Sequence, residues 1–296
     1  MDKSKVANFA DDSTVYATED NALKLLTLLN KETGVILNWF KINEMKSNDD
    51  KCHLIMSNTN KNYTSKGFIY LGNKFIESEE TVDLLGVKID NKLNFSEHVN
   101  KLIKKGNQKL HALARISRYL CKDKLKLIMR AFIESQFNYC PLIWMFHNRV
   151  INNKINRLHE RALRVVYKND QLTFQQLLEK DKSVTIHDRN LRRLAIEMYK
   201  VKNHLVPLPV QELFSESIST YKLRNERRWE VPRVKTENFG KETIRYRGIT
   251  TWELVPKYIK ESKTLSIFKA KIKEWKPHGC TCRLCKQYIF NLGYIL

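Results

Sequence analysis

The stretch that decides the fold is residues 5–17, K-V-A-N-F-A-D-D-S-T-V-Y-A, in which two adjacent carboxylates separate two strand-forming runs. Lys5–Ala10 and Ser13–Ala17 are predicted strands, with Asp11 and Asp12 at the turn between them. Adjacent acids at such a turn can bind divalent cations through oxygen ligands. Two ions about 4 Å apart would hold the oxygens of an in-line phosphoryl transfer. The alternative is a pair of solvated acids at an ordinary turn.

The charge of the chain is divided unevenly around this start. Residues 1–100 carry 12 Lys and Arg against 15 Asp and Glu, whereas residues 101–296 carry 41 against 17, a net charge of +24. This asymmetry predicts a C-terminal part that binds a polyanion, joined to a part with a different task. The 296 residues, 42% of them hydrophobic, exclude a wholly disordered chain.

The sequence also indicates a compartment. Its N-terminus, M-D-K-S-K-V-A-N-F-A-D-D, has no apolar secretory region, and no apolar stretch is long enough to span a bilayer. Cys52, Cys121 and Cys140 stand alone, which is typical of reduced thiols rather than of a disulfide framework. We therefore expect an intracellular protein of the cytoplasm or nucleus, with no membrane partner.

The pattern of apolar residues predicts an α+β fold. One helix is expected over Asn21–Trp39, and the predicted strands that follow are Cys52–Met56, Phe68–Phe75 and Val82–Ile89. Gly86 in the last of them suggests a bulge or a close backbone approach. From residue 94 the pattern is helical. Predicted helices begin near Asn94 and near Asp123, and others cover Ile151–Tyr167, Phe174–Leu178, Ile186–His204 and Thr264–Trp275. The helix near Asp123 is expected to bury Leu127, Ile128, Ala131, Phe132 and Ser135.

The first of these helices surrounds its apolar stripe with basic side chains. Residues 101–150 carry 11 basic and 2 acidic side chains, an excess that favours a surface for nucleic-acid phosphates over a merely solvated face. Such contacts position a nucleic acid without reading its sequence. The predicted contact residues are Lys101, Lys104, Lys105, Lys109 and Arg115.

A second candidate nucleic-acid segment is Tyr221–Arg247, where aromatic and Arg side chains alternate. Arg227, Arg228 and Trp229 are its centre, and their planar groups can stack on unpaired bases. The alternative, equally favoured by the sequence, is that the aromatic residues belong to the core.

Near the C-terminus, Cys280, Cys282 and Cys285 follow His278 within eight residues. Three thiols and an imidazole suit tetrahedral zinc, and the fourth ligand is expected to be His278 or a distant residue. The C-x-C-x2-C spacing is tighter than paired zinc knuckles, so a reduced thiol cluster without metal is the alternative.

The order of these motifs resembles one family. Phe9–Asp12 resembles the catalytic FADD box of reverse transcriptases of non-LTR (LINE-type, jockey-like) retrotransposons. Trp39-Phe40 and Asn48–Leu54 are similar to the next block of that family, and Leu84–Asp90 to its primer-grip block. Further similarity lies in Tyr139 and Trp144, assigned to the second basic helix, in Tyr246-Arg247-Gly248, and in the closing Cys motif.

This resemblance implies a partial polymerase palm over residues 1–93, a helical thumb-like domain over 94–205, and a basic C-terminal region over 206–296 with the Cys cluster 280–285. Asp11 and Asp12 would be Mg²⁺ ligands. Lys51 would protonate the pyrophosphate leaving group. Without the resemblance, the sequence around Lys51 predicts only an exposed lysine at the end of a strand. Leu85, Gly86 and Val87 would position the primer. The implied partners are an RNA template and a DNA primer.

The resemblance also predicts a deficit. In this family the fingers and a first palm strand with its own catalytic Asp precede the FADD box, whereas here ten residues precede Asp11. A two-metal site needs carboxylates from both palm segments. We therefore expect the chain by itself to be catalytically incomplete. The alternative function is a non-enzymatic RNA- or DNA-binding module derived from the thumb and the C-terminal region.

Overall fold

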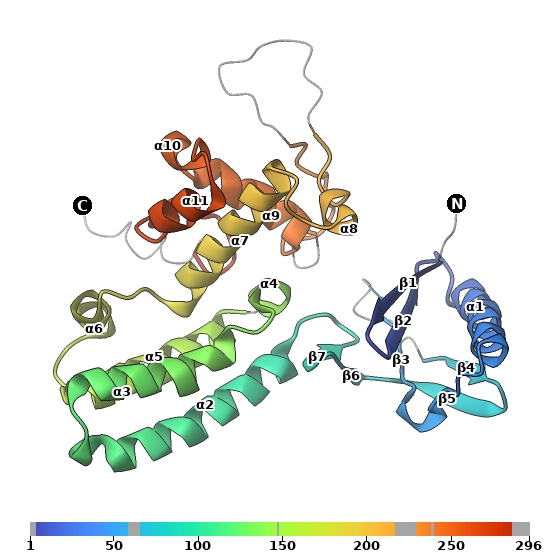
Figure 1. The fold of residues 1–296 in the computed structure, drawn as a ribbon, viewed down its shortest axis with the longest axis horizontal. Helices are drawn as coiled ribbons and strands as arrows, with labels where there is room; N and C mark the ends of the chain where they lie inside the picture. Colours follow the sequence, from blue (N-terminus) through green and yellow to red (C-terminus); the bar gives the residue numbers. More distant parts are fainter. Residues whose placement is uncertain (1–3, 59–65, 147, 217–228, 238–239, 286–296) are drawn as a thin grey trace, which may run out of the picture. The chain divides into compact units, whose positions relative to one another are not determined.

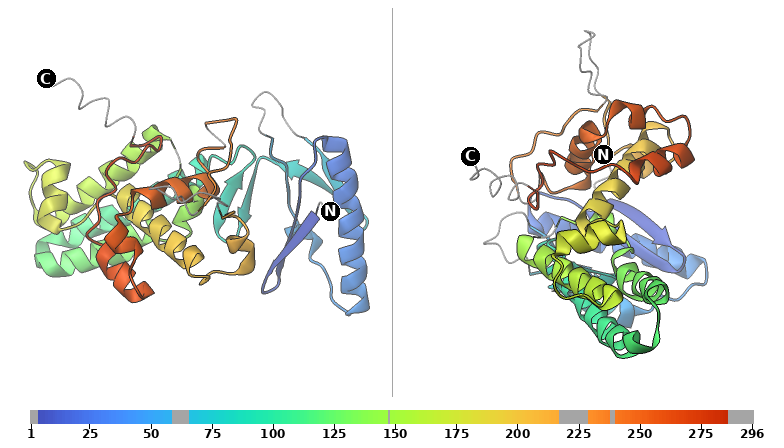
Figure 2. Two further views of the ribbon diagram at one scale, coloured as in Figure 1. Left: turned by 90° about the horizontal axis from the view of Figure 1, so that it is seen from above. Right: turned by 90° about the vertical axis from the view of Figure 1, so that its left-hand side faces the viewer.

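A computed structural model of the chain describes residues 4–58, 66–146, 148–216, 229–237 and 240–285. The fold is α+β, as predicted, and it divides into two compact units, Met1–Glu97 and His98–Leu296 (Figures 1 and 2). None of the described helices combines the length and apolar character needed to cross a membrane.

The first unit holds all the described strands except an isolated bridge. Its elements are β1 (Ser4–Phe9), β2 (Asp12–Ala17), α1 (Ala22–Ile42), η1 (Asp49–Lys51), β3 (Leu54–Ile55), β4 (Phe68–Leu71), β5 (Lys74–Glu79), β6 (Thr81–Leu84) and β7 (Val87–Asp90). They form a β1–β2 hairpin, a three-stranded sheet in the order β3-β5-β4, and a β6–β7 hairpin. In the three-stranded sheet β3 runs parallel to β5, and β4 runs antiparallel to it.

Two predicted strands are in fact hairpins. Phe68–Phe75 turns at Gly72, where φ is 61°, and Val82–Ile89 turns at Leu85 and Gly86, where φ is 47° and 80°. Gly86 is therefore a turn residue and not a bulge. Consecutive positive φ angles, as at Leu85 and Gly86, are what a type I′ hairpin turn requires, and they match the twist of the flanking strands.

The core of the first unit lies between α1 and the three-stranded sheet. Asn21 caps α1 by accepting a hydrogen bond from the Leu23 backbone N–H at 2.8 Å. Leu29 of α1 shares an apolar cluster with four buried residues of β3, β4 and β5 and their flank, namely Leu54, Met56, Ile69 and Ile76. This small cluster joins the helix to the sheet and leaves the β1–β2 hairpin largely exposed.

The second unit is helical. Its elements are α2 (Ser96–Ile116), η2 (Ser117–Tyr119), α3 (Lys122–Ile128), η3 (Met129–Ile133), η4 (Glu134–Phe137), α4 (Pro141–Trp144), α5 (Arg149–Tyr167), α6 (Phe174–Asp181), α7 (Ile186–Lys202), α8 (Leu208–Gln211), α9 (Ile244–Leu254), α10 (Lys257–Lys260) and α11 (Leu265–Ile272). The sequence missed α9, which lies in a segment without a clear apolar period.

The buried face of α3 and η3 differs from the prediction. Leu125, Met129 and Ile133 are buried, whereas Leu127 is 68% exposed and Phe132 is 56% exposed. Both sets of apolar residues recur at helical spacing, so periodicity alone did not identify the face that meets the other helices. Tyr139 and Trp144, assigned to the second basic helix, lie beyond it, Trp144 as the last residue of α4.

A buried carboxylate links η4 to α5 and α7. Glu134 Oε2 lies 2.8 Å from an Arg189 guanidinium nitrogen, and Glu134 Oε1 lies 3.4 Å from His159 Nε2. Burial alone would raise the pKa of Glu134, but His159 and Arg189 stabilise the carboxylate and lower that pKa to about 2. The ionised form of Glu134 is therefore part of the native structure.

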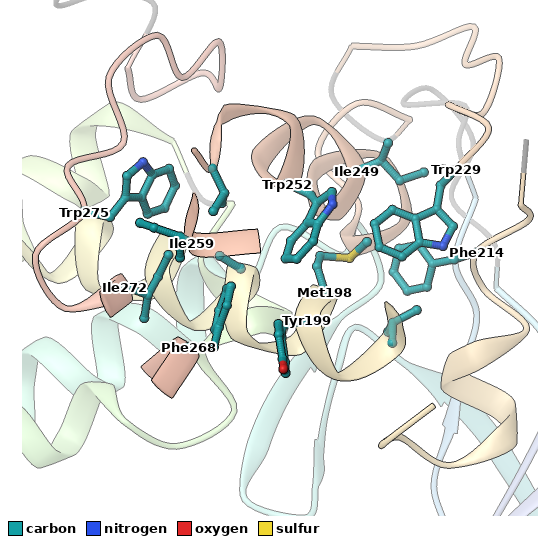
Figure 3. Packing of buried hydrophobic residues seen from close by; sticks show 13 residues of the cluster. Met198, Tyr199, Phe214, Trp229, Ile249, Trp252, Ile259, Phe268, Ile272 and Trp275 are labelled. Carbon is teal, nitrogen blue, oxygen red and sulfur yellow. The ribbon is translucent and has the colours of Figure 1, made fainter. Parts of the chain in front are cut away.

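An aromatic-rich core surrounds α7 (Figure 3). Met198 and Tyr199 of α7 meet the aromatic residues of α9, α11 and the preceding loop. Tyr199 stacks on Phe268 with ring centroids 4.3 Å apart, and Trp252 lies edge-on to Trp229 at 5.7 Å. The described C-terminal helices α9, α10 and α11 therefore share one apolar core with α7.

Candidate metal centre

Four side chains with metal-binding atoms converge beside the start of α7. They are His187, Cys280, Cys282 and Cys285, and their ligand atoms all lie within 4.8 Å of one another. His187 comes from α7, and the three thiols come from the segment that follows α11. Among the described residues, no other group of three or more His, Cys, Asp or Glu side chains has its ligand atoms this close together.

The N-terminal cap of α7 positions His187. Thr185 accepts a hydrogen bond from the backbone N–H of Asp188 at 3.1 Å, and its hydroxyl donates to the Asp188 carboxylate at 2.8 Å. His187, in the first turn, is buried, and its Nε2 lies 3.3 Å from the Sγ atoms of both Cys282 and Cys285. Nε2 is therefore the ring atom available to a metal.

A tight turn brings the thiols together. Gly279 has φ of +79°, a left-handed conformation that costs glycine little, and it immediately precedes Cys280. The backbone N–H of Cys285 donates to the Cys282 carbonyl at 3.1 Å and approaches its Sγ at 3.4 Å. Such N–H groups orient and stabilise sulfur ligands.

Apolar side chains surround the thiols. Cys280, Cys282 and Leu284 share a buried cluster with Met145, which follows α4, and Leu191 of α7. Cys285 is half-buried. Burial holds the four donors in a region largely screened from water.

A buried cation lies near the thiols. Arg247 of α9 is paired with Glu242, to which its Nε donates at 3.1 Å. Burial alone would lower the Arg247 pKa, but the hydrogen bond to the Glu242 carboxylate and its negative charge raise it. Hydrogen bonds from Cys282 and Cys285 lower the pKa of Cys280 in turn. The surroundings of the cluster therefore favour thiolate at Cys280.

The fourth donor differs from the local candidate in the sequence. His278 is exposed and lies outside the group, and His187 takes its place. His187 is 95 residues from Cys282, so no local spacing links them. The sequence suggested a distant ligand as one option but contained no signal that selected His187.

The predicted catalytic residues lie in the first unit. Asp11 and Asp12 are exposed at the β1–β2 turn, where Phe9 pairs with Asp12. No third His, Cys, Asp or Glu of the described residues joins them in a ligand group. Two exposed carboxylates do not make a two-ion site, so we derive no catalytic step through Mg²⁺. Lys51 ends η1 and is exposed.

The predicted primer-positioning residues form the tip of the second hairpin. Leu85 and Gly86 make its turn, and Val87, the first residue of β7, is buried. Leu84 pairs with Val87 across the hairpin. The turn thus presents the Leu85 side chain, 41% exposed, while Val87 anchors the strand.

The predicted nucleic-acid residues have different outcomes. The four exposed ones lie on α2, namely Lys101, Lys104, Lys105 and Arg115, whereas Lys109 is half-buried with its ammonium 6.0 Å from the centre of the Phe132 ring. For Trp229 the structure agrees with the core alternative, because its side chain is 1% exposed and lies beside Trp252. Arg227 and Arg228 lie outside the described residues.

Comparison with known proteins identifies no relative: no family model, curated protein or solved structure matches the chain.

Proposed function

We propose that the chain is part of the RNA-directed DNA polymerase of a non-LTR retrotransposon, and that these 296 residues bind nucleic acid without polymerising nucleotides on their own. The observation that carries the proposal is the position of Asp11 and Asp12 at the turn of a β-hairpin. A hairpin tip is where adjacent carboxylates can reach metal-bound phosphates together. The exposure of both side chains agrees with that role.

The second hairpin adds support. Its turn contains Leu85 and Gly86, the residues that resemble a primer grip. A two-residue turn with positive φ at both positions holds its backbone in a fixed shape. A rigid tip of this kind suits the positioning of a primer strand.

The basic face of α2 supports binding. Lys104 and Lys105 are exposed neighbours there, and the helix presents further cations one and three turns away. Closely spaced exposed cations attract phosphates and release counterions from a nucleic acid. This face also supports the second candidate function, a non-enzymatic RNA- or DNA-binding module.

Salt-dependent binding of a primer–template hybrid tests the proposal. The full chain should bind an RNA template annealed to a DNA primer, and Lys104→Ala/Lys105→Ala should reduce the slope of log affinity against log salt by about two. The double variant Lys24→Ala/Lys31→Ala, which removes two exposed lysines of α1, is the matched control. An affinity that does not change with salt concentration would contradict the proposal.

A nucleotide-incorporation assay separates the two candidate functions. We expect no templated incorporation by the purified chain, because Asp11 and Asp12 gain no further ligand among the described residues. Incorporation that disappears in Asp11→Ala would show that the chain is catalytically complete. Incorporation that appears when the first palm segment of this family is supplied would favour the polymerase over the binding module.

We also propose that Zn²⁺ is the ion of the His187–Cys280–Cys282–Cys285 group. Thiolate and imidazole are the ligands of structural zinc, whereas Mg²⁺ and Ca²⁺ take oxygen ligands. One zinc ion per purified chain is expected. A zinc content that is unchanged in Cys282→Ser/Cys285→Ser would remove this proposal.

A further inference from the structure

We infer that the metal centre is a closed structural site that fastens residues 276–285 to α7, so that metal binding and the docking of this segment are one event. The inference rests on the zinc assignment proposed above. It goes beyond that assignment by giving the ion a mechanical role and His187 the role of anchor.

The number of donors makes the site closed. A catalytic zinc keeps one position for water or substrate, whereas a structural zinc takes four protein ligands. With Zn–S near 2.3 Å and Zn–N near 2.05 Å, tetrahedral geometry places a nitrogen about 3.6 Å from each sulfur. His187 Nε2 lies 3.3 Å from two of the sulfurs, so a small outward movement admits the ion.

The segment has no regular secondary structure, because residues 276–285 belong to no helix or strand. Its internal backbone hydrogen bonds include those from His278 to Lys276 and from Cys285 to Cys282, both of them local. Its apolar anchors are Cys280, Cys282 and Leu284. Two of these three anchors, Cys280 and Cys282, are also candidate ligands. The metal and the apolar contacts would therefore hold the same two residues in place.

The ligands also span a long piece of chain. His187 and Cys285 are 98 residues apart, and the chain between them includes α9, α10 and α11. A metal bridge therefore closes a loop that contains most of the aromatic core around α7. Closing a long loop removes more conformational entropy from the unfolded chain than closing a short one, which favours the folded state.

The test uses the full chain, with zinc as the probe. Arg283 precedes the buried Leu284, so trypsin should cleave this bond slowly in the zinc-loaded chain and at least about tenfold faster after chelation, because cleavage requires the segment to leave its site. The melting temperature should fall on chelation, and added zinc should restore both measurements. Co²⁺ in place of zinc should give the absorption spectrum of a tetrahedral thiolate site.

Single variants then identify the anchor. Loss of an outer-shell partner weakens metal binding about 10–100-fold, so His187→Asn, which removes a ligand, should weaken zinc by at least about 100-fold. It should also give the fast cleavage at Arg283. His278→Asn, at the exposed neighbouring histidine, is the matched control and should change neither. Because Cys285 is half-buried, Cys285→Ser provides a second variant that loses a ligand with little change in shape.

The outcomes separate the proposals from one another. Absence of bound zinc overturns the zinc assignment and this inference with it. One zinc per chain, with cleavage at Arg283 equally slow before and after chelation, overturns the fastening role alone. Tight zinc binding by the His187→Asn variant overturns the role of His187 as the anchoring ligand. Nucleic-acid binding is measured separately, so failure of the polymerase-derived function leaves this result standing.

Discussion

Gly106 of α2 lies directly against Leu158 of α5, so closely that a Cβ atom at position 106 would come within 2.5 Å of Leu158 Cδ2. Gly106→Ala should therefore destabilise the helical unit by about 1–3 kcal/mol, although alanine is the better helix former. Urea unfolding monitored by circular dichroism measures the change.

Gly34 of α1 provides the matched control. It is exposed, and no atom lies within 4 Å of a Cβ built at this position. Gly34→Ala should stabilise the first unit by about 0.5–1 kcal/mol, because a mid-helix glycine loses more conformational entropy on folding than alanine does. Equal effects at Gly34 and Gly106 would contradict the close approach of α2 to α5.

Acid should weaken the helical unit through Glu134. Its pKa is lowered from 4.5 to about 2 in the folded chain, so its contribution is fully present above about pH 4.5 and is lost as the pH falls toward 2. That shift corresponds to about 3 kcal/mol at neutral pH. Glu134→Gln should lose this amount at pH 7 and show a flatter stability profile between pH 5 and 2. Parallel profiles for the two proteins would refute the role of Glu134.

The β1–β2 turn contains a residue in an unfavourable conformation. Ala10 has φ of 51°, a left-handed value that costs an L-residue about 1 kcal/mol. Ala10→Gly should remove this cost and raise the stability of the first unit by several tenths of a kcal/mol. Ala7→Gly, in the middle of β1, should lower it by about 0.5–1 kcal/mol. Thermal unfolding of the two variants distinguishes them, and a loss of stability in both would contradict the turn geometry.

Two variants of Trp229 distinguish a role in the core from a role in stacking on nucleic-acid bases. Its side chain is 1% exposed and contacts Phe214 and Trp252, so Trp229→Ala should cost about 3–5 kcal/mol of stability. Trp229→Phe keeps most of the apolar volume and should retain full nucleic-acid affinity. A large loss of affinity in a stably folded Trp229→Phe chain would restore the stacking role.

The sequence predicted the elements whose pattern is local. The helix over Ile151–Tyr167 needed only its apolar spacing, and the turn at Asp11 needed only two acids between strand formers. Predictions that depended on tertiary contacts were less accurate. Leu127 and Leu125 are equally apolar, and only contact with other helices decides that Leu125 is buried.

The metal centre illustrates the same limit of local pattern. Cys280, Cys282 and Cys285 are neighbours in sequence and were identified as candidate ligands together. His187 was not, because its place in the group depends on how α7 lies against a segment that begins almost 90 residues later. The two alternatives for Trp229 stayed open for a similar reason, since an aromatic residue among arginines has the same local signal whether it stacks on a base or fills a core.

The central position of α7 has a consequence for synthesis on the ribosome. Met198 and Tyr199 are translated before the partners that cover them in α9 and α11, and His187 precedes Cys280 by more than 90 residues. At a few to about twenty residues per second, the apolar face of α7 stays uncovered for several seconds or more. The apolar face of this nascent helix is therefore open to chaperones for a defined interval, which ends when α9 and α11 have emerged.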